Sequence, residues 1–337
     1  MSKRATMNDI ALGAGVSQAT VSLVLNEVAN ARVSASTRRR VKELAASLGY
    51  TLKRGALTRG GTRVIALLID DVTSTPFAAQ LIEGARAEAA LQGCIVAVIC
   101  TGSDPETESA ALQMLGQAGL VGVLYATLLT RSVVAPDLLH QVPSILLNCH
   151  DKSHSFVSVV PSDVAAGFAA TTALIAAGHR RIAHLPGEDW GEAARDRLLG
   201  YRRALAAHDI AYDPALVTGP AWTIASGRDM TQHLLDQPDP PTAIFCFNDR
   251  VAIGCYDALE RRGLSVPRDM SVVGFDNDDL AANLQPPLST MVLPHDEMAR
   301  WAVAQVLNPD KSAPRRFKVE CEFLPRGSIA APRRYGV

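Results

Sequence analysis

The chain has 337 residues, of which 48% are hydrophobic and only 5% aromatic, and its formal net charge is −1. This length allows two or three domains. Its apolar runs, such as Val64–Ile69, are far shorter than the ~20 residues of a membrane span, and the N-terminus lacks the apolar core of a signal peptide. We therefore expect a cytoplasmic protein with no membrane partner. The six cysteines show no CxxC spacing, which favours reduced packing residues over disulfides or metal ligands.

The first 26 residues predict two short helices about a tight turn. Thr6 and Ser17 are expected to cap the two helices, with Asp9 as capping-box partner of Thr6, and Gly15 allows the turn. The apolar faces consist of Ile10, Ala11, Val21 and Val24. The outward side of the second helix consists of Gln18, Ala19, Ser22 and Leu23. This is the layout of a helix-turn-helix that places its second helix in the major groove, although capped helix pairs also occur in proteins that never bind DNA.

The charge distribution favours the DNA-binding interpretation. Residues 1–63 contain eleven Lys and Arg against three acidic residues, a net charge of +8, so the remainder carries −9. A basic head suits contact with phosphates, and an acidic body avoids nonspecific adhesion to nucleic acid.

A third helix is expected after Ser34, which would cap it. Val41, Leu44, Ala45 and Leu48 recur at helical spacing, and Gly49 is expected to end the helix. Residues 1–49 therefore form a three-helix head. Residues 50–63 are basic and rich in glycine, and we interpret them as a hinge or linker.

From Val64 onward, buried strands alternate with helices, which predicts an α/β core of two tandem doubly wound units. The predicted strands are 64–69, 95–100, 121–125, 144–147, 157–160, 182–185, 243–247 and 271–275. The predicted helices are 77–92, 106–118, 164–177, 193–208, 225–236 and 250–262. We expect residues 64–337 to form an N-subdomain (about 64–156 and 280–308) and a C-subdomain (about 157–279 and 309–330), with a cleft between them.

Polar side chains follow several of the predicted strands. They are Asp70, Asp71, Asn148, His150, Asn248, Asp249, Asp276 and Asn277. Each alone reads as a helix cap, but their convergence on one cleft favours a ligand site. Arg195 and Arg197 open a helix, where a cation is poorly placed unless it reaches an anionic or polyhydroxylated group. Trp190 and Trp222 lie in loop-like sequence, where they either stack on a sugar ring or cover the edge of the core.

These features together resemble the LacI/GalR family of bacterial transcription regulators over nearly the whole chain. The matching blocks include Asp9–Ala11, Ala14–Ser17, Thr20–Ser22, Val24–Asn26, Gly178–Ala183, Asn248–Asp249, Pro267–Asp276 and Pro286–Thr290. The resemblance implies a homodimeric repressor whose head and hinge bind a pseudo-palindromic operator. It also implies a periplasmic-binding-protein-like core whose cleft takes a small effector, often a sugar. We expect no cofactor, no metal site and no catalytic residues.

The resemblance also implies site residues. For DNA binding they are Thr6, Ser17, Gln18, Ala19, Thr20, Ser22, Leu23, Asn26, Arg32 and Leu57. For effector binding they are Asp71, Phe77, Asn148, Trp190, Arg197, Trp222, Asn248 and Asp276. We expect Arg197 and Asp276 to hold a polar effector from opposite sides. Leu293 and His295 stand where some sugar-responsive members have Gln and Phe.

The hinge departs from the family pattern. Tyr50 and Leu57 are seven positions apart, whereas the family commonly has nine, and Leu52 and Lys53 replace the usual Pro and Asn. We still expect Leu57, the large apolar side chain of the middle of the linker, to enter the minor groove at the operator centre.

Two other functions fit parts of the sequence. A periplasmic-type sugar-binding protein without DNA function would have a similar core, but the basic head argues against it. An enzyme on a doubly wound fold could use the Asp, His and Arg residues of the cleft, but the sequence contains no GxGxxG, Walker or GxSxG motif. We therefore predict a DNA-binding transcription regulator that a small ligand controls.

Overall fold

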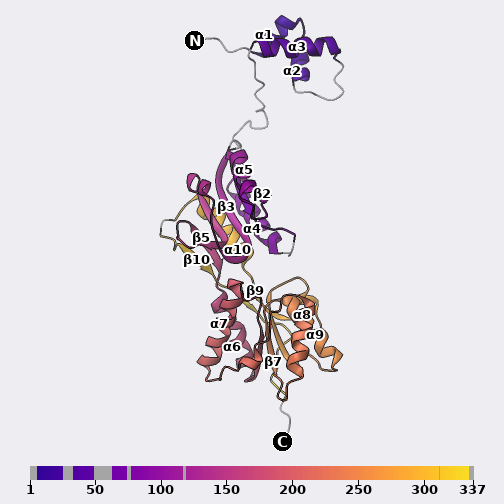
Figure 1. Cartoon of the computed structure of the whole chain (residues 1–337), viewed down its shortest axis with the longest axis vertical. Helices are drawn as coiled ribbons and strands as arrows, with labels where there is room; N and C mark the ends of the chain where they lie inside the picture. The colour runs from indigo at the N-terminus through magenta and orange to yellow at the C-terminus, as the bar shows by residue number, and fades with distance from the viewer. Residues whose placement is uncertain are drawn as a thin grey trace. The chain divides into compact units, whose positions relative to one another are not determined.

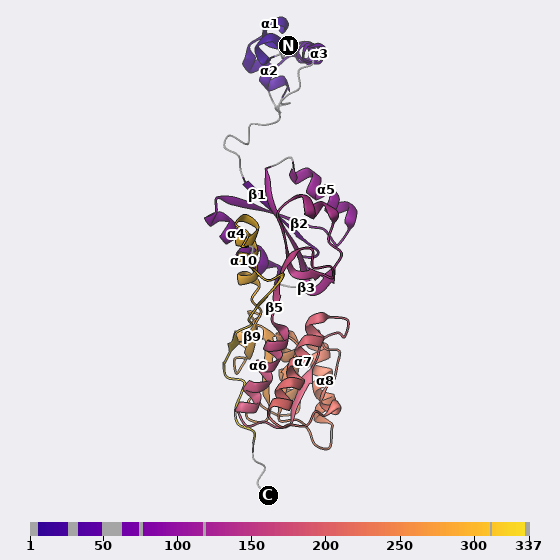
Figure 2. The ribbon, with the colours of Figure 1, turned by 90° about the vertical axis from the view of Figure 1, so that its left-hand side faces the viewer.

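The computed structural model describes residues 6–25, 33–48, 63–73, 77–116, 119–310 and 312–333. The chain divides into two compact units, residues 1–61 and residues 62–337. The first contains the N-terminal helices and the second contains both β-sheets (Figure 1, Figure 2). None of the helices in these ranges is long and apolar enough to cross a membrane.

The first unit contains the three predicted helices, α1 (Met7–Ala14), α2 (Gln18–Leu25) and α3 (Ala35–Ser47). The predicted caps are confirmed. The Thr6 hydroxyl accepts a hydrogen bond from the Asp9 amide, and the Asp9 carboxylate accepts one from the Thr6 amide at 2.8 Å. Ser17 Oγ accepts a hydrogen bond from the Thr20 amide at 3.1 Å, and Ser34 caps α3 in the same way. Gly15 ends α1 with a φ of 62°, the left-handed conformation that glycine adopts without steric cost.

The three helices share one small hydrophobic core. The buried residues of this core are Ile10, Ala11, Ala14, Val21, Val24, Val41 and Ala45. The apolar faces predicted for the first two helices are therefore confirmed, and α3 supplies the third side of the core.

The second unit begins with a six-stranded parallel sheet in the order β10-β5-β4-β3-β1-β2. Its strands are β1 (Arg63–Ile69), β2 (Cys94–Cys100), β3 (Leu120–Val133), β4 (Ser144–Asp151), β5 (Val157–Pro161) and β10 (Arg316–Val319). Its helices are α4 (Phe77–Leu91), α5 (Pro105–Gly116), α10 (His295–Leu307) and the 3-10 turn η1 (Asp137–Gln141). Ile65, Leu67 and Ile69 of β1 pack with α4 and α10, and Ala66 and Leu68 pack with α5. Both faces of this N-subdomain sheet are therefore covered.

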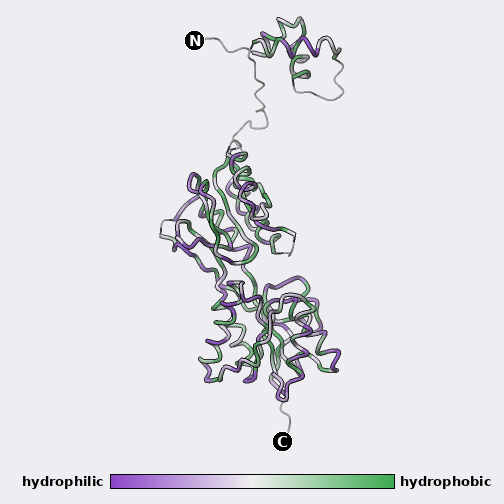
Figure 3. Tube along the Cα trace, viewed as in Figure 1, coloured by the Kyte–Doolittle hydropathy of each residue, from purple (hydrophilic) through white to green (hydrophobic). Residues whose placement is uncertain are grey.

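A five-stranded sheet in the order β11-β9-β8-β7-β6 forms the C-subdomain. Its strands are β6 (Ile182–Leu185), β7 (Ala243–Cys246), β8 (Ser271–Asp276), β9 (Ser289–Val292) and the antiparallel edge strand β11 (Phe323–Leu324). Its helices are α6 (Asp163–Ala176), α7 (Glu192–Ala207), α8 (Ile224–Leu235), α9 (Asp249–Arg261) and the turns η2 (Pro214–Leu216) and η3 (Ala281–Asn283). α6 and α7 cover one face and α8 and α9 the other (Figure 1). Helices α7, α8 and α9 carry hydrophilic residues between their hydrophobic ones, as helices with one buried face require (Figure 3).

The chain passes between the two sheets three times, at 161–163, 292–295 and 319–323. The predicted boundaries differ from this arrangement. Residues 157–160 were assigned to the C-subdomain, but β5 pairs with β4 and β10 in the N-subdomain sheet. Residues 280–308 were expected in the N-subdomain, but β9 lies in the C-subdomain sheet. Residues 309–330 were expected in the C-subdomain, but β10 lies in the N-subdomain sheet. A short apolar run reads the same in either parallel sheet, so hydropathy alone could not decide which sheet each strand joins.

The close contact of α6 with α7 depends on two glycines that face each other. A Cβ atom on Gly200 would overlap the carbonyl oxygen of Val164 and lie 2.6 Å from the backbone nitrogen of Phe168. A Cβ atom on Gly167 would overlap the backbone of Arg197. The spacing of these two helices therefore fixes where Arg197 lies.

We predict that Gly200→Ala lowers the free energy of unfolding by about 2 kcal/mol, because the added methyl group must push the helices apart. The matched control is Gly116→Ala at the end of α5, where none of the described atoms outside the adjoining helix backbone lies within 4 Å of the added Cβ. That variant should be unchanged or up to about 1 kcal/mol more stable. Urea unfolding followed by circular dichroism measures both. Equal stability of the two variants would show that the α6–α7 contact tolerates a larger side chain.

Candidate functional site

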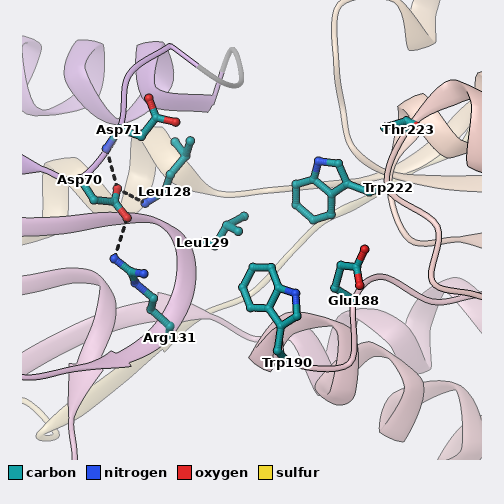
Figure 4. A pocket seen from close by; sticks show the side chains of 9 residues that line it. All are labelled: Asp70, Asp71, Leu128, Leu129, Arg131, Glu188, Trp190, Trp222 and Thr223. Atoms are coloured by element: carbon teal, nitrogen blue, oxygen red, sulfur yellow. Dashed lines mark hydrogen bonds and ion pairs between the residues drawn. The ribbon is translucent and has the colours of Figure 1, made fainter. Parts of the chain in front are cut away.

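Two adjoining cavities lie between the walls of the N-subdomain and the C-subdomain, and they share Leu128, Leu129 and Trp222. The outer cavity has a volume of about 630 Å³ and the inner one about 30 Å³. Figure 4 shows the outer cavity, with Trp190 and Trp222 of the C-subdomain across from the acidic side chains of the N-subdomain.

Asp70 organises the N-subdomain wall of the outer cavity. It follows β1, and its Oδ1 accepts hydrogen bonds from the amides of Asp71 (2.9 Å) and Leu128 (2.8 Å). Its Oδ2 accepts one from Arg131 Nη2 at 3.0 Å (Figure 4). Opposite this pair, Trp190 is 61% exposed, so a large flat apolar surface remains open to a ligand.

Asn148 holds an irregularity in the neighbouring strand. The pairing of β3 with β4 shifts register between Ala126 and Arg131. Asn148, with a φ of 57°, donates hydrogen bonds from Nδ2 to the carbonyl oxygens of Thr127 and Leu128, both at 3.0 Å, and its Oδ1 accepts one from Thr130 at 2.7 Å. Both amide hydrogens are therefore used inside the protein. Asn148 therefore holds the part of β3 that carries Leu128 and Leu129, which line both cavities.

Arg197 on α7 is the central cation of the inner cavity and is buried. Its Nε donates to Asp163 Oδ1 at 2.8 Å, and its Nη1 donates to the carbonyl oxygen of Phe247 at 2.7 Å. The guanidinium lies 3.4 Å from the centroid of the Phe275 ring. Its unfavourable place near the start of a helix is thus compensated by a carboxylate and by the faces of aromatic rings.

Asp276 ends β8 beside this arginine. Its Oδ1 lies 4.0 Å from Arg197 Nη1, so the two residues are neighbours on one wall, and the expectation that they hold a ligand from opposite sides was wrong. Asp276 has a φ of 103°, an unusual conformation for a residue with a side chain. Burial raises the pKa of its carboxyl well above the ordinary value, against the opposing attraction of Arg197. Strained backbone of this kind is concentrated at functional sites.

Seven of the eight predicted effector residues line one or both cavities. They are Asp71, Phe77, Asn148, Trp190, Arg197, Trp222 and Asp276. Asn248 does not line either cavity. Its Oδ1 caps α9 by accepting a hydrogen bond from the Val251 amide at 2.8 Å, and its Nδ2 donates to the carbonyl oxygen of Trp222 at 3.2 Å. Asn248 therefore positions Trp222.

Several lining residues were not among the predicted effector residues. Among the ionisable ones, Arg131 and Glu188 line the outer cavity, and His295 lines the inner one. Glu188 lies three residues beyond β6, so a search for polar residues that follow a strand could have found it. His295 begins α10 after a proline, and in the sequence only its departure from the family pattern marked it.

The structure describes the side chains of only some of the predicted DNA-binding residues. The hydroxyls of Thr6 and Ser17 serve as helix caps, and Thr20 Oγ1 lies 2.9 Å from Ser17 Oγ. Gln18 is exposed at the first position of α2. Ala19, Ser22 and Leu23 lie within α2, but their side chains fall outside the described residues, as do Asn26, Arg32 and Leu57.

We predict that Arg197→Ala lowers the free energy of unfolding by about 3–5 kcal/mol at pH 7, because it leaves buried Asp163 and Asp276 without their cation. The loss should shrink as the pH falls, because the orphaned carboxyls can then take up protons and become neutral. Urea unfolding at pH 5 and pH 7 measures this difference. Arg203→Ala, an exposed arginine of the same helix, should change stability by less than about 0.5 kcal/mol. A pH-independent loss would contradict the assignment.

Both units are similar to domains of known proteins. Residues 6–52 match bacterial regulatory proteins of the lacI family, and residues 171–329 match a periplasmic binding protein-like domain. The chain is 32% identical to the ribose operon repressor of Haemophilus influenzae, over 93% of this chain and 94% of the relative. It superposes on a lac repressor dimer bound to operator and the anti-inducer ONPF (TM-score 0.68, 26% identity, 98% of this chain and 100% of the other).

A further solved structure is the transcriptional regulator CelR in complex with cellobiose. Its TM-score is 0.63 at 29% identity, covering 96% of this chain and all of the other. The similarity therefore extends through the head, the paired sheets and the cleft, and it includes a relative at more than 30% identity over nearly its whole length. The chain belongs to the LacI family of bacterial regulatory proteins, and it is a DNA-binding transcriptional regulator.

Proposed function

We propose that this regulator is a repressor that binds a pseudo-palindromic operator as a homodimer in the cytoplasm, and that a sugar-like effector in the cleft controls it. The observation that carries the proposal is the combination, in one chain, of a capped helix-turn-helix head with a cleft whose two walls both present polar and aromatic side chains. The relatives and solved structures are regulators, which supports a binding function and argues against an enzyme.

The head supplies both kinds of contact that operator recognition needs. Gln18 is exposed at the start of α2, and a glutamine in the major groove can bind an adenine edge through two hydrogen bonds. Arg39 and Arg40 are exposed on α3 and add to the positive charge that attracts phosphates.

Helix α7 is the element that connects ligand binding with the arrangement of the subdomains. Its first residue, Glu192, lies 2.7 Å from His150 Nε2 of β4 and 3.8 Å from Arg316 Nη1 of β10. One turn later it carries Arg197 into the inner cavity. A ligand bound between the walls therefore acts on the same helix that the N-subdomain already holds.

We infer that the effector shifts the equilibrium between open and closed arrangements of the two subdomains and so changes operator affinity. A coupling free energy of ~1–3 kcal/mol would change that affinity ~5–150-fold. The related CelR structure carries cellobiose, and the related lac repressor structure carries the anti-inducer ONPF. The aromatic and hydrogen-bonding walls of the cleft described above are suited to the same chemical class.

We predict that operator binding weakens steeply with salt, because the +8 charge of the first 63 residues acts mainly on phosphates. A dimer that makes ~6–10 phosphate contacts should lose ~10³–10⁵ in affinity between 50 and 200 mM salt. Fluorescence anisotropy with an operator selected from a random DNA pool measures this slope. A flat salt dependence would refute electrostatic binding by the head.

We predict that Gln18→Ala relaxes the preference for one base pair in each operator half-site. It should cost ~1–3 kcal/mol of specific affinity and leave binding to random duplex DNA nearly unchanged. Selection of binding sites with the wild type and the variant compares the two preferences. Arg203→Ala on α7 is the control, since it removes an exposed side chain outside the head. An unchanged consensus sequence would show that Gln18 does not read a base.

A further inference from the structure

The start of helix α7 meets the N-subdomain through charged side chains that line neither cavity. Glu192 is the first residue of α7, and its Oε2 lies 2.7 Å from His150 Nε2 of β4. Because an ionised carboxylate only accepts hydrogen bonds, the imidazole is the donor. The other carboxylate oxygen, Oε1, lies 3.8 Å from Arg316 Nη1 of β10. One carboxylate of the C-subdomain therefore contacts two strands of the N-subdomain sheet.

The residues beside this contact continue the pattern of opposite charges. Asp196 lies four residues after Glu192 on α7, and Lys318 lies two residues after Arg316 on β10. Residues four apart share one side of a helix, and residues two apart share one face of a strand. Burial raises the pKa of the Asp196 carboxyl, as do the charges of Asp163 and Glu192, whereas the charge of Lys318 lowers it. An acidic side of α7 thus lies within electrostatic reach of a basic face of β10.

Two buried polar atoms weaken this contact. His150 is only 7% exposed, and its Nδ1 has no hydrogen-bond partner among the described residues, and the same holds for the buried Nε of Arg316. Each atom gives up its hydrogen bonds to water and receives none from the protein, which offsets part of the stabilisation by the charged pair. Water can hydrate both atoms once the subdomains separate. The net stabilisation is therefore small, as is required of a contact that ligand binding is to strengthen or break.

We propose that Glu192, His150 and Arg316 form a charge latch, which sets how often the two subdomains separate when no ligand is bound. The proposal rests on the proposed function, since it names the residues that set the equilibrium which the effector shifts. The latch holds the first residue of the helix that carries Arg197 into the inner cavity. Glu192 is thus a positioning residue.

A role of Glu192 in the helix alone leads to a different expectation. Gly191 supplies no side-chain cap for α7, and an acidic residue in the first turn stabilises a helix through the helix dipole. Replacing such a residue by lysine weakens the helix, and no change on β10 repairs it. A latch between two subdomains is repaired when the charges are exchanged. Glu192→Lys and Arg316→Glu should each separate the subdomains, and the double variant should restore the contact.

The experiment measures the separation directly in the full chain, without ligand or DNA. Spin labels are placed at Gln113 on α5 and Ala225 on α8, two exposed residues of different subdomains. They are carried by noncanonical amino acids, so the native cysteines stay, and an excess of unlabelled protein keeps labels of different copies apart. Double electron–electron resonance should give one main distance for the wild type. In Glu192→Lys a second distance should appear, with the ratio of separated to latched molecules raised about tenfold or more.

Glu106→Lys is the matched control. It makes the same charge change at an exposed glutamate in the first turn of another helix, α5, and should keep the distance of the wild type. Urea unfolding of each variant shows how much stability the helix itself has lost. The double variant should regain the distance of the wild type even where its stability stays lower.

The latch and the proposed function fail in different ways. A distance distribution of Glu192→Lys equal to that of the wild type would overturn the latch, as would a double variant that stays as separated as the single variants. Fluorescence anisotropy on the same proteins, with an operator selected from a random DNA pool, should show an operator affinity that changes together with the distance. Separation without a change in operator affinity would support the latch and contradict the proposed link between subdomain arrangement and DNA binding.

Discussion

The buried guanidinium of Arg197 joins the elements that form the inner end of the cleft. It binds a carboxylate at the start of α6, a carbonyl group just after β7 and the face of an aromatic ring of β8. One charged side chain thus ties together the sheet and the two helices that cover its face. Its position depends on the glycine contact between α6 and α7, because Gly167 meets the backbone of Arg197. The spacing of α6 and α7 therefore decides where the guanidinium lies, and with it both the pairing of its charge and the shape of the inner cavity.

The two walls of the cleft contribute different chemistry. The N-subdomain contributes a carboxylate–guanidinium pair and the leucines of an irregular strand, whereas the C-subdomain contributes tryptophans, a buried arginine and a strained aspartate. In the function proposed above, a ligand that contacts both walls would change the arrangement of two subdomains that are each rigidly packed.

Sequence patterns located the cleft more reliably than they assigned its residues. Polar residues after parallel strands converge because of topology, so Asp71 and Asp276 could be found from the strand pattern alone. The roles of Asn148 and Asn248 could not be found that way, because an asparagine at a strand end can cap a helix, hold a bulge or bind a ligand. His295 could not be found that way either, because it follows β9, and no strand was predicted there. The sequence could not show which sheet β5 joins, because that depends on its pairing with β4 and β10, and a short apolar run reads the same in either sheet.

The three passages between the sheets affect how the protein is made. α10 covers one face of the N-subdomain sheet, and β10 and β11 complete one edge of each sheet, so both subdomains need residues from beyond position 294. The head needs only the first 48 residues for its helices and its core. Because chains emerge from the ribosome N-terminus first, the head can fold while most of the core is still being synthesised. A nascent chain would then carry a folded DNA-binding module well before the part that senses the ligand exists.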